Sequence, residues 1–340
     1  MAKADINISG LNEEELLNLR ISQLPLSIEG TWLQACIQQL YSELDERDIG
    51  FKPSCYLADE WLTPDNEPVI GIPFFLAHPV LMKLEKKMML DVEGGTRTWC
   101  MKLLRHETGH AINYAYKLYR RKKWREIFGP FSQEYADTYR FRPYSKNFVI
   151  HLQDHYAQCH PDEDFAETFA VWLNPRINWK KQYRGWRAIN KLKYVEDIIE
   201  DIKNKPPLVK RGKKYWEASR MKSTLRSYYK KKRYINAENF PDFHDANLKK
   251  IFACENPGEE PVLGAADVVK RHKKEILNNV ARWTGEKKYI INDLLSAIYE
   301  RCRSLNLCTA REEVRVISEI SVYVATLVMN YLYTGSFRKE

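Results

Sequence analysis

The sequence predicts an α+β fold: a small sheet with an edge strand and several long helices, followed by an all-helical C-terminal region. Two short strand-like runs, 55–62 and 68–76, flank a turn-forming stretch. Helical hydrophobic periodicity occupies much of the remaining chain, and the last third shows only helical patterns. With 340 residues, of which 44% are hydrophobic, the chain can form one large domain or two modest ones.

Composition and cysteine use fit a folded cytoplasmic protein. Aromatic residues make up 12% of the chain, which excludes a disordered composition. The first residues lack a basic start and an apolar core, so we expect no secretory signal. The apolar stretch 320–333 is too short and too polar to span a membrane. The seven cysteines form no Cys-x-x-Cys pair, so we expect reduced thiols and no cysteine zinc site.

The positive charge is concentrated in one segment. The whole chain has a formal net charge of +9, but residues 205–233 contain twelve Lys and Arg and one acid, and the rest of the chain is slightly acidic. Such a segment could bind a polyanion, either nucleic acid or an acidic peptide. It could instead be a solvated helix face or a linker. We favour a solvated face or linker, because no recognisable nucleic-acid-binding module accompanies the charge.

The first third of the chain is expected to contain an amphipathic helix followed by the two strands of the sheet. Residues 31–45 have the apolar spacing of an amphipathic helix, which Gly50 and Pro53 terminate. The strands 55–62 and 68–76 follow, separated by the turn-forming sequence TPDNEP. Prolines in and around the second strand cannot donate to a sheet, so we expect this strand at an edge, where it is either an ordinary edge strand or a pairing site for a peptide substrate.

Two further helices are expected after the sheet. Residues 80–90 carry a Leu/Met stripe that fits core packing. Gly94 and Gly95 form a turn, and Thr96 begins a long, buried helix that ends near Arg121. The basic and aromatic segment 120–143 is either the wall of a cleft or a solvated cover.

The long helix contains the motif His106-Glu107-Thr108-Gly109-His110. Residues four apart share a helix face, so His106 and His110 can place two imidazole nitrogens on one metal ion. Glu107 lies one position round, where its carboxylate can reach a water that the metal activates. This arrangement is typical of zincin metalloproteases, but five residues can also match by chance.

A catalytic zinc site takes three protein ligands, so a third donor is needed downstream. Pro161 and the three acids after it fit the first turn of a helix over 161–173. We favour Glu163, because this register leaves a second carboxylate, Glu167, on the same face at i+4. Asp164 is the alternative. Three histidines nearby are more often packing residues than ligands: His151, His155 and His160.

The two helices together resemble a known family. HETGH followed by PDEDFAETFAVWL is similar to a bacterial family of zinc-binding metallopeptidases and, more distantly, to the lethal-factor-like gluzincins, over roughly residues 50–200. The resemblance implies a zincin-like core in which the two motif histidines and Glu163 hold one Zn²⁺. It also implies that Glu167 supports the first motif histidine and that Tyr156 stabilises an oxyanion, although Tyr156 also fits a core aromatic.

The chemistry implied by these residues is hydrolysis of a peptide or isopeptide bond. Zinc would lower the pKa of a water toward neutrality, and Glu107 would take the proton of that water and return it to the leaving amine. Tyr156 would stabilise the developing oxyanion. The substrate would be a peptide or protein, and the basic segment would suit an acidic one.

The C-terminal third adds helices. After a helix over 184–202, residues 203–214 resemble a linker and 215–233 a basic helix with aromatics. Three more helical patterns cover 265–285, 288–305 and 310–333. We therefore expect a metallopeptidase domain over 1–202, a basic linker and helix over 203–233, and a helical region over 234–340.

Two functions from different classes compete. The first is an intracellular zinc metallopeptidase. The second is a non-catalytic zincin scaffold that binds nucleic acid or an acidic protein through the basic segment, with its densest charges at Lys230, Lys231, Lys232 and Arg233. The complete ligand set favours the first, because a scaffold without activity has no need of the general base Glu107.

Overall fold

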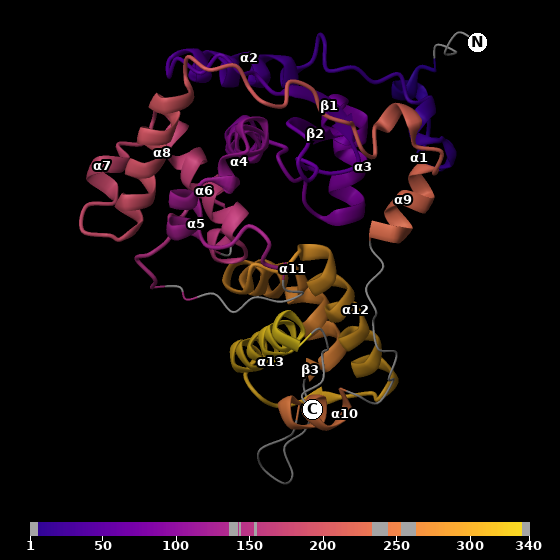
Figure 1. The fold of residues 1–340 in the computed structure, drawn as a ribbon. Helices are drawn as coiled ribbons and strands as arrows, with labels where there is room; N and C mark the ends of the chain where they lie inside the picture. The colour runs from indigo at the N-terminus through magenta and orange to yellow at the C-terminus, as the bar shows by residue number, and fades with distance from the viewer. Residues whose placement is uncertain are drawn as a thin grey trace. The chain divides into compact units, whose positions relative to one another are not determined.

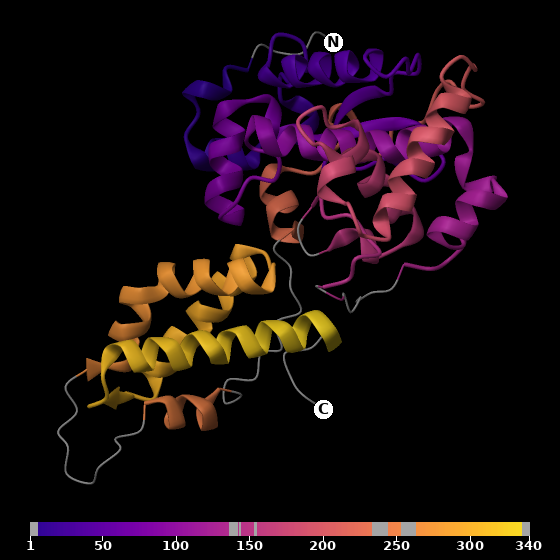
Figure 2. The ribbon, with the colours of Figure 1, turned by 90° about the vertical axis from the view of Figure 1, so that its left-hand side faces the viewer.

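The computed structural model describes residues 6–135, 142, 144–152, 155–232, 244–252 and 263–334. The chain forms two compact units (Figures 1 and 2). Unit 1 comprises Met1–Lys87 and Val92–Tyr229, and unit 2 comprises Met88–Asp91 and Lys230–Glu340. The His-Glu-x-x-His motif lies in unit 1.

The first two thirds of the chain combine many helices with a two-stranded sheet, in agreement with the predicted α+β class. The strands are β1 (Ser54–Ala58) and β2 (Val69–Pro73). The helices are α1 (Glu13–Asn18), α2 (Trp32–Asp45), α3 (Pro79–Met89), α4 (Arg97–Tyr116), α5 (Lys122–Phe128), α6 (Pro161–Leu173), α7 (Trp179–Gln182), α8 (Ala188–Ile202) and α9 (Leu225–Lys232). Helix α4 ends five residues before the predicted Arg121, because Lys117 adopts a left-handed conformation with φ of 50°.

The sheet is parallel, and the connection between its two strands pairs with the outer edge of β2. Strands β1 and β2 pair in parallel, and Leu62 then forms an antiparallel bridge with Gly71 on the other side of β2. Gly71 permits this approach, because a Cβ there would lie 2.3 Å from Cδ2 of Leu62. Strand β2 is shorter than the predicted edge strand 68–76. Its outer edge is not open to another strand at Gly71, because both backbone groups of Gly71 bond to Leu62.

Helices α4 and α6 cross at the centre of unit 1 with their backbones in close contact (Figure 1). A Cβ on Gly109 would lie 2.7 Å from Cα and 3.0 Å from the carbonyl oxygen of Ala166. Every residue of α6 is buried, and α4 is buried without interruption from Leu103 to its end. Gly109, which lies inside the sequence motif, thus allows the two helices to meet.

A buried ion pair joins α4 to α2. Arg105 donates from Nε and Nη2 to the two carboxylate oxygens of Glu43, with both distances 2.7 Å. Both residues are only 4% exposed. A two-pronged pair of this kind is the geometry that best offsets the cost of burying both charges. Because Arg105 directly precedes His106, the pair fixes the helix beside the motif.

The segment between α8 and α9 packs on unit 1 through its backbone. The N–H groups of Leu208 and Val209 donate to the carbonyl of Ala115, and Tyr215 N–H donates to the hydroxyl of Tyr56. Figure 1 shows this segment as an orange trace that runs from α8 to α9. The helix predicted over 215–233 is therefore shorter: α9 covers only Leu225–Lys232, because the residues before it bond to neighbouring elements instead of closing helical bonds.

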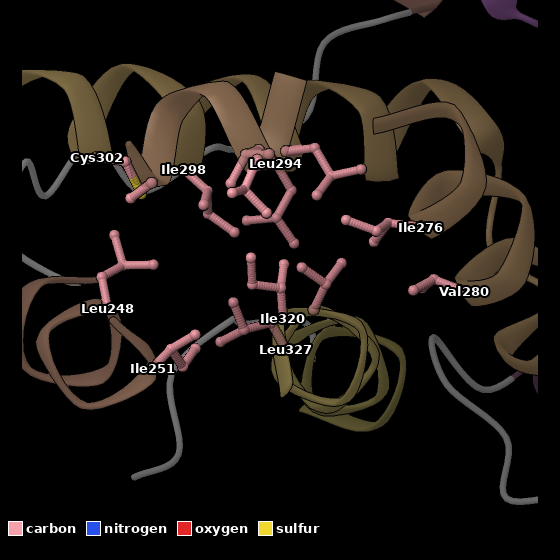
Figure 3. Close-up of a cluster of buried hydrophobic side chains, with 14 of the residues drawn as sticks. Leu248, Ile251, Ile276, Val280, Leu294, Ile298, Cys302, Ile320 and Leu327 are labelled. Atoms are coloured by element: carbon pink, nitrogen blue, oxygen red, sulfur yellow. The ribbon is translucent and has the colours of Figure 1, made fainter. Parts of the chain in front are cut away.

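Unit 2 consists mainly of helices that pack around one apolar core (Figures 2 and 3). Its helices are α10 (Asp245–Ile251), α11 (Ala265–Thr284), α12 (Lys288–Ser304) and α13 (Glu313–Thr334). Side chains from all four helices meet in Figure 3, among them Leu248, Ile276, Ile298 and Ile320. Within the described ranges, no helix is long and apolar enough to cross a membrane.

The prediction of an all-helical C-terminal region is wrong in one detail. Two short strands, β3 (Leu263–Gly264) and β4 (Cys308–Thr309), pair in an antiparallel manner. Asn306 has a φ of 49°, which ends α12 and returns the chain to the start of α11. There Ala265 N–H donates to the carbonyl of Leu307.

The helix crossing predicts that Gly109→Ala destabilises the protein. The added methyl group would clash with the backbone of Ala166. The clash should outweigh the roughly 1 kcal/mol that alanine gains in helix propensity, so we expect a net loss of about 1–3 kcal/mol in unfolding free energy. Urea unfolding measures the change. Gly50→Ala is the control, because a Cβ added at Gly50 would have no atom within 4 Å. Equal stability of the two variants would contradict the proposed role of Gly109.

The buried ion pair predicts that Glu43→Ala is strongly destabilising. The substitution would leave the Arg105 charge buried without its partner, at a cost of about 3–5 kcal/mol in unfolding free energy. The exposed pair of Lys52 with Asp45 provides a comparison, since Asp45→Ala should cost less than about 1 kcal/mol. Similar unfolding midpoints for the two variants would show that the buried pair does not hold α2 to α4.

Candidate metal centre

Three metal-binding side chains converge where α4 and α6 cross. The Nε2 atoms of His106 and His110 lie 3.2 Å apart, and Oε2 of Glu163 lies 3.1 and 3.2 Å from them. All three residues are buried, and their donor atoms lie within 4.8 Å of one another. In the part of the chain that the structure describes, this is the one group of His, Cys, Asp and Glu residues that could hold a metal ion.

A carboxylate holds the outer nitrogen of the first motif histidine. His106 Nδ1 lies 2.9 Å from Oε1 of Glu167, whose other oxygen accepts a bond from the Leu152 N–H. With the proton on Nδ1 donated to Glu167, Nε2 can present its lone pair to the centre of the group. The structure thus places Glu167 within hydrogen-bond distance of the first motif histidine.

The second motif histidine has a carboxylate partner that the sequence analysis missed. His110 Nδ1 lies 2.8 Å from Oδ2 of Asp162, which also accepts a bond from the Tyr114 hydroxyl. The amide of Asn113 donates to Oδ1 of the same carboxylate. The signal in the sequence was the pair of polar residues three and four positions after His110, on the same helix face. Asp162 was assigned only a place in the first turn of α6.

Asp164 has a different neighbour. Its carboxylate forms an ion pair with Lys191 on α8. Burial raises the pKa of Asp164 to about 7, against the opposing attraction of Lys191. The structure thus brings Glu163 to the two histidines and places Asp164 against another helix.

Glu107 and Tyr156 lie close to the histidine pair. Glu107 is buried, and its backbone carbonyl accepts a bond from Thr63 Oγ1. Burial raises the pKa of Glu107, although the neighbouring His106 and His110 oppose the shift. The Tyr156 ring lies 5.8 Å from the ring of His106, centroid to centroid.

The other nearby histidines have structural partners. His160 is the N-cap of α6, where Nδ1 accepts the N–H of Asp162. The Nε2 of His151 lies 3.0 Å from the carbonyl of Lys102. His155 precedes the turn at Tyr156 in a left-handed conformation with φ of 54°. None of these histidines belongs to the group of converging donors.

Three of the four basic residues of the predicted polyanion site lie in the last turn of α9. Lys230 and Lys231 are exposed and Lys232 is partly buried, whereas Arg233 lies outside the described residues. The described lysines do not belong to the group of converging donors.

The donor set fits a zinc ion. Two imidazoles and one carboxylate are a common set of protein ligands for catalytic zinc, and both imidazoles have the carboxylate partner that usually orients such ligands. Burial alone would lower the pKa of His106, but its bonds with Glu163 and Glu167 outweigh this effect and raise the pKa to about 10. A proton therefore competes with a metal cation for this site.

The raised pKa of His106 predicts that zinc affinity increases with pH. His106 is protonated at neutral pH, and a metal must displace that proton. We expect the apparent affinity to increase by up to tenfold per pH unit below pH 10 for each proton released. Competition with a chelator between pH 6 and 8, corrected for protonation of the chelator, measures it, and a pH-independent affinity would disprove the prediction.

In metal-free protein, the raised pKa of His106 stabilises the fold below about pH 6.5, and this contribution is lost as the pH rises through 10.

Comparison with known proteins agrees with this chemistry. No curated protein and no solved structure gave a match. Residues 72–183 match the model of a family described as "putative zinc-binding metallo-peptidase". That segment includes both α4 and α6, and thus all three converging donors. The match confirms the family that the sequence resemblance indicated: the segment that carries the site matches a zinc-binding metallopeptidase family.

Proposed function

We propose that unit 1 is a zincin-like core, of the gluzincin type, that hydrolyses a peptide or isopeptide bond with the help of one zinc ion. The observation that carries the proposal is the convergence of His106, His110 and Glu163, with a carboxylate behind each imidazole. The matched family supports the same reaction class.

The proposed metal site is built from two buried helices. His106 and His110 of α4 and Glu163 of α6 would hold the ion, while Glu167 and Asp162 keep the imidazole rings in orientation. A zinc ion held there would polarise a water and the substrate carbonyl. The other steps of the reaction depend on residues of the chain.

Glu107 is the proposed general base. It follows His106 on α4, so the same helix positions both residues. A carboxylate whose pKa is raised by burial toward the working pH is a more effective base than an exposed one. We propose that it takes a proton from the attacking water and passes it to the leaving amine.

Tyr156 is the proposed oxyanion donor. Its ring lies beside that of His106, and its hydroxyl would donate to the carbonyl oxygen as negative charge develops there. The substrate we propose is a peptide or protein segment. We also propose a cytoplasmic location, because the six cysteines in the described ranges are free thiols.

The alternative is a scaffold that binds nucleic acid or an acidic protein through the basic segment 205–233. One observation favours it: backbone bonds fix the segment, while the basic side chains of Lys210 and Arg211 remain exposed. Trp216 in the same segment is 59% exposed. DNA binding that weakens steeply with salt would support this alternative.

The proposed mechanism predicts opposite metal contents for two inactive variants. Glu107→Gln should retain zinc and lose activity at least about 100-fold, because only the proton acceptor is removed. His110→Ala should lose zinc as well, because a ligand is removed. Elemental analysis and cleavage of a denatured protein such as casein measure the two properties.

A surface glutamate supplies the control for this experiment. Glu126→Gln on α5 should behave as the wild type, since Glu126 is exposed and pairs only loosely with Lys122. Wild-type turnover by a zinc-replete Glu107→Gln protein would rule out the assigned role of Glu107.

A further inference from the structure

The two carboxylate oxygens of Glu163 have different partners. Oε2 faces the Nε2 atoms of both motif histidines, at 3.1 and 3.2 Å. Oε1 accepts a hydrogen bond of 2.9 Å from the hydroxyl of Tyr135. One oxygen is thus directed to the metal site, and the other is held by a residue 28 positions earlier in the chain.

Tyr135 is positioned by the residue at the start of the ligand helix. Its ring is stacked on that of His160, with the centroids 3.9 Å apart and an interplanar angle of 14°. His160 is 4% exposed, and its Nε2 lies 2.7 Å from the carbonyl of Gln133. Because His160 is also the N-cap of α6, the Gln133–Tyr135 segment is attached to the helix that carries Glu163.

The Tyr135 hydroxyl is suited to remain a donor. A carboxylate oxygen can only accept a hydrogen bond, so the hydroxyl is the donor in its 2.9 Å contact with Oε1 of Glu163. At the same time, half of the side chain is exposed to solvent. The hydroxyl therefore contacts a buried carboxylate from a residue at the surface.

We propose that Tyr135 is a positioning residue that restricts Glu163 to binding the metal through Oε2 alone. The inference rests on the metal centre proposed above. A carboxylate can bind a metal through one oxygen or two, and a catalytic zinc site must keep one position for water or substrate. By occupying Oε1, Tyr135 keeps that position open.

A purely structural role for Tyr135 would have different consequences. If the residue served only to attach the Gln133–Tyr135 segment, then the stack on His160 would be the important contact, and the hydroxyl would be dispensable. Tyr135→Phe removes the hydroxyl and keeps the ring, whereas Tyr135→Ala removes both. Ligation and attachment can therefore be separated.

The test uses the full chain loaded with Co²⁺ in place of Zn²⁺, because the visible absorption of Co²⁺ is stronger in four-coordinate than in five-coordinate sites. We expect Tyr135→Phe to show weaker absorption than the wild type and about tenfold lower zinc affinity. The urea midpoint of the metal-free protein should be unchanged, because the ring and its stack on His160 remain. Tyr135→Ala should show the same spectral change. Tyr144→Phe is the matched control, since Tyr144 is 94% exposed, and should match the wild type.

The outcomes separate this inference from the proposed function. If Tyr135→Phe binds cobalt and zinc as the wild type does, the role of Tyr135 is wrong and the metal centre stands. The same conclusion follows if only Tyr135→Ala changes the spectrum, because the stack and not the hydroxyl would then act. If the wild-type chain binds neither metal, both the metal centre and the role of Tyr135 are wrong.

Discussion

The close crossing of α4 and α6 is the constraint on which the rest of unit 1 depends. Two helices that each carry functional groups at i and i+4 can place all of them in one layer only if their backbones come close together. Gly109 against Ala166 provides that proximity. This glycine lies between the two motif histidines, so the motif serves packing as well as chemistry.

Charge compensation explains why the site tolerates so much buried acid. Asp162, Glu163 and Glu167 are all less than 7% exposed, and each bonds to a histidine of α4. Buried carboxylates are costly unless a positive charge or several hydrogen bonds satisfy them. The imidazoles and their polar neighbours, such as Tyr114, supply those bonds, and a bound cation would add the charge.

The sequence alone could predict the main part of the site, because helical spacing is a local property. His106 and His110 had to share a face, and the favoured third donor, Glu163, does lie beside them in the structure. The two helices also begin close to the predicted residues. The polar residues after His110 indicated a polar partner, but the identity of that partner, Asp162, depends on how α6 is rotated. The Tyr135 contact depends on where a loop folds, so the sequence could not predict it. The ion pair between Arg105 and Glu43 joins residues 62 positions apart, and no periodic pattern connects them.

The short connection between β1 and β2 contacts both the sheet and the motif helix. Parallel strands usually require a crossover of a dozen or more residues, often with a helix, whereas residues 59–68 connect β1 to β2 without one. The same connection bonds to β2 through Leu62 and to the carbonyl of Glu107 through Thr63. Most surface loops accept insertions easily. Residues 59–63 have little freedom to change length in evolution, because an added residue there would shift Leu62 against Gly71 or Thr63 against Glu107.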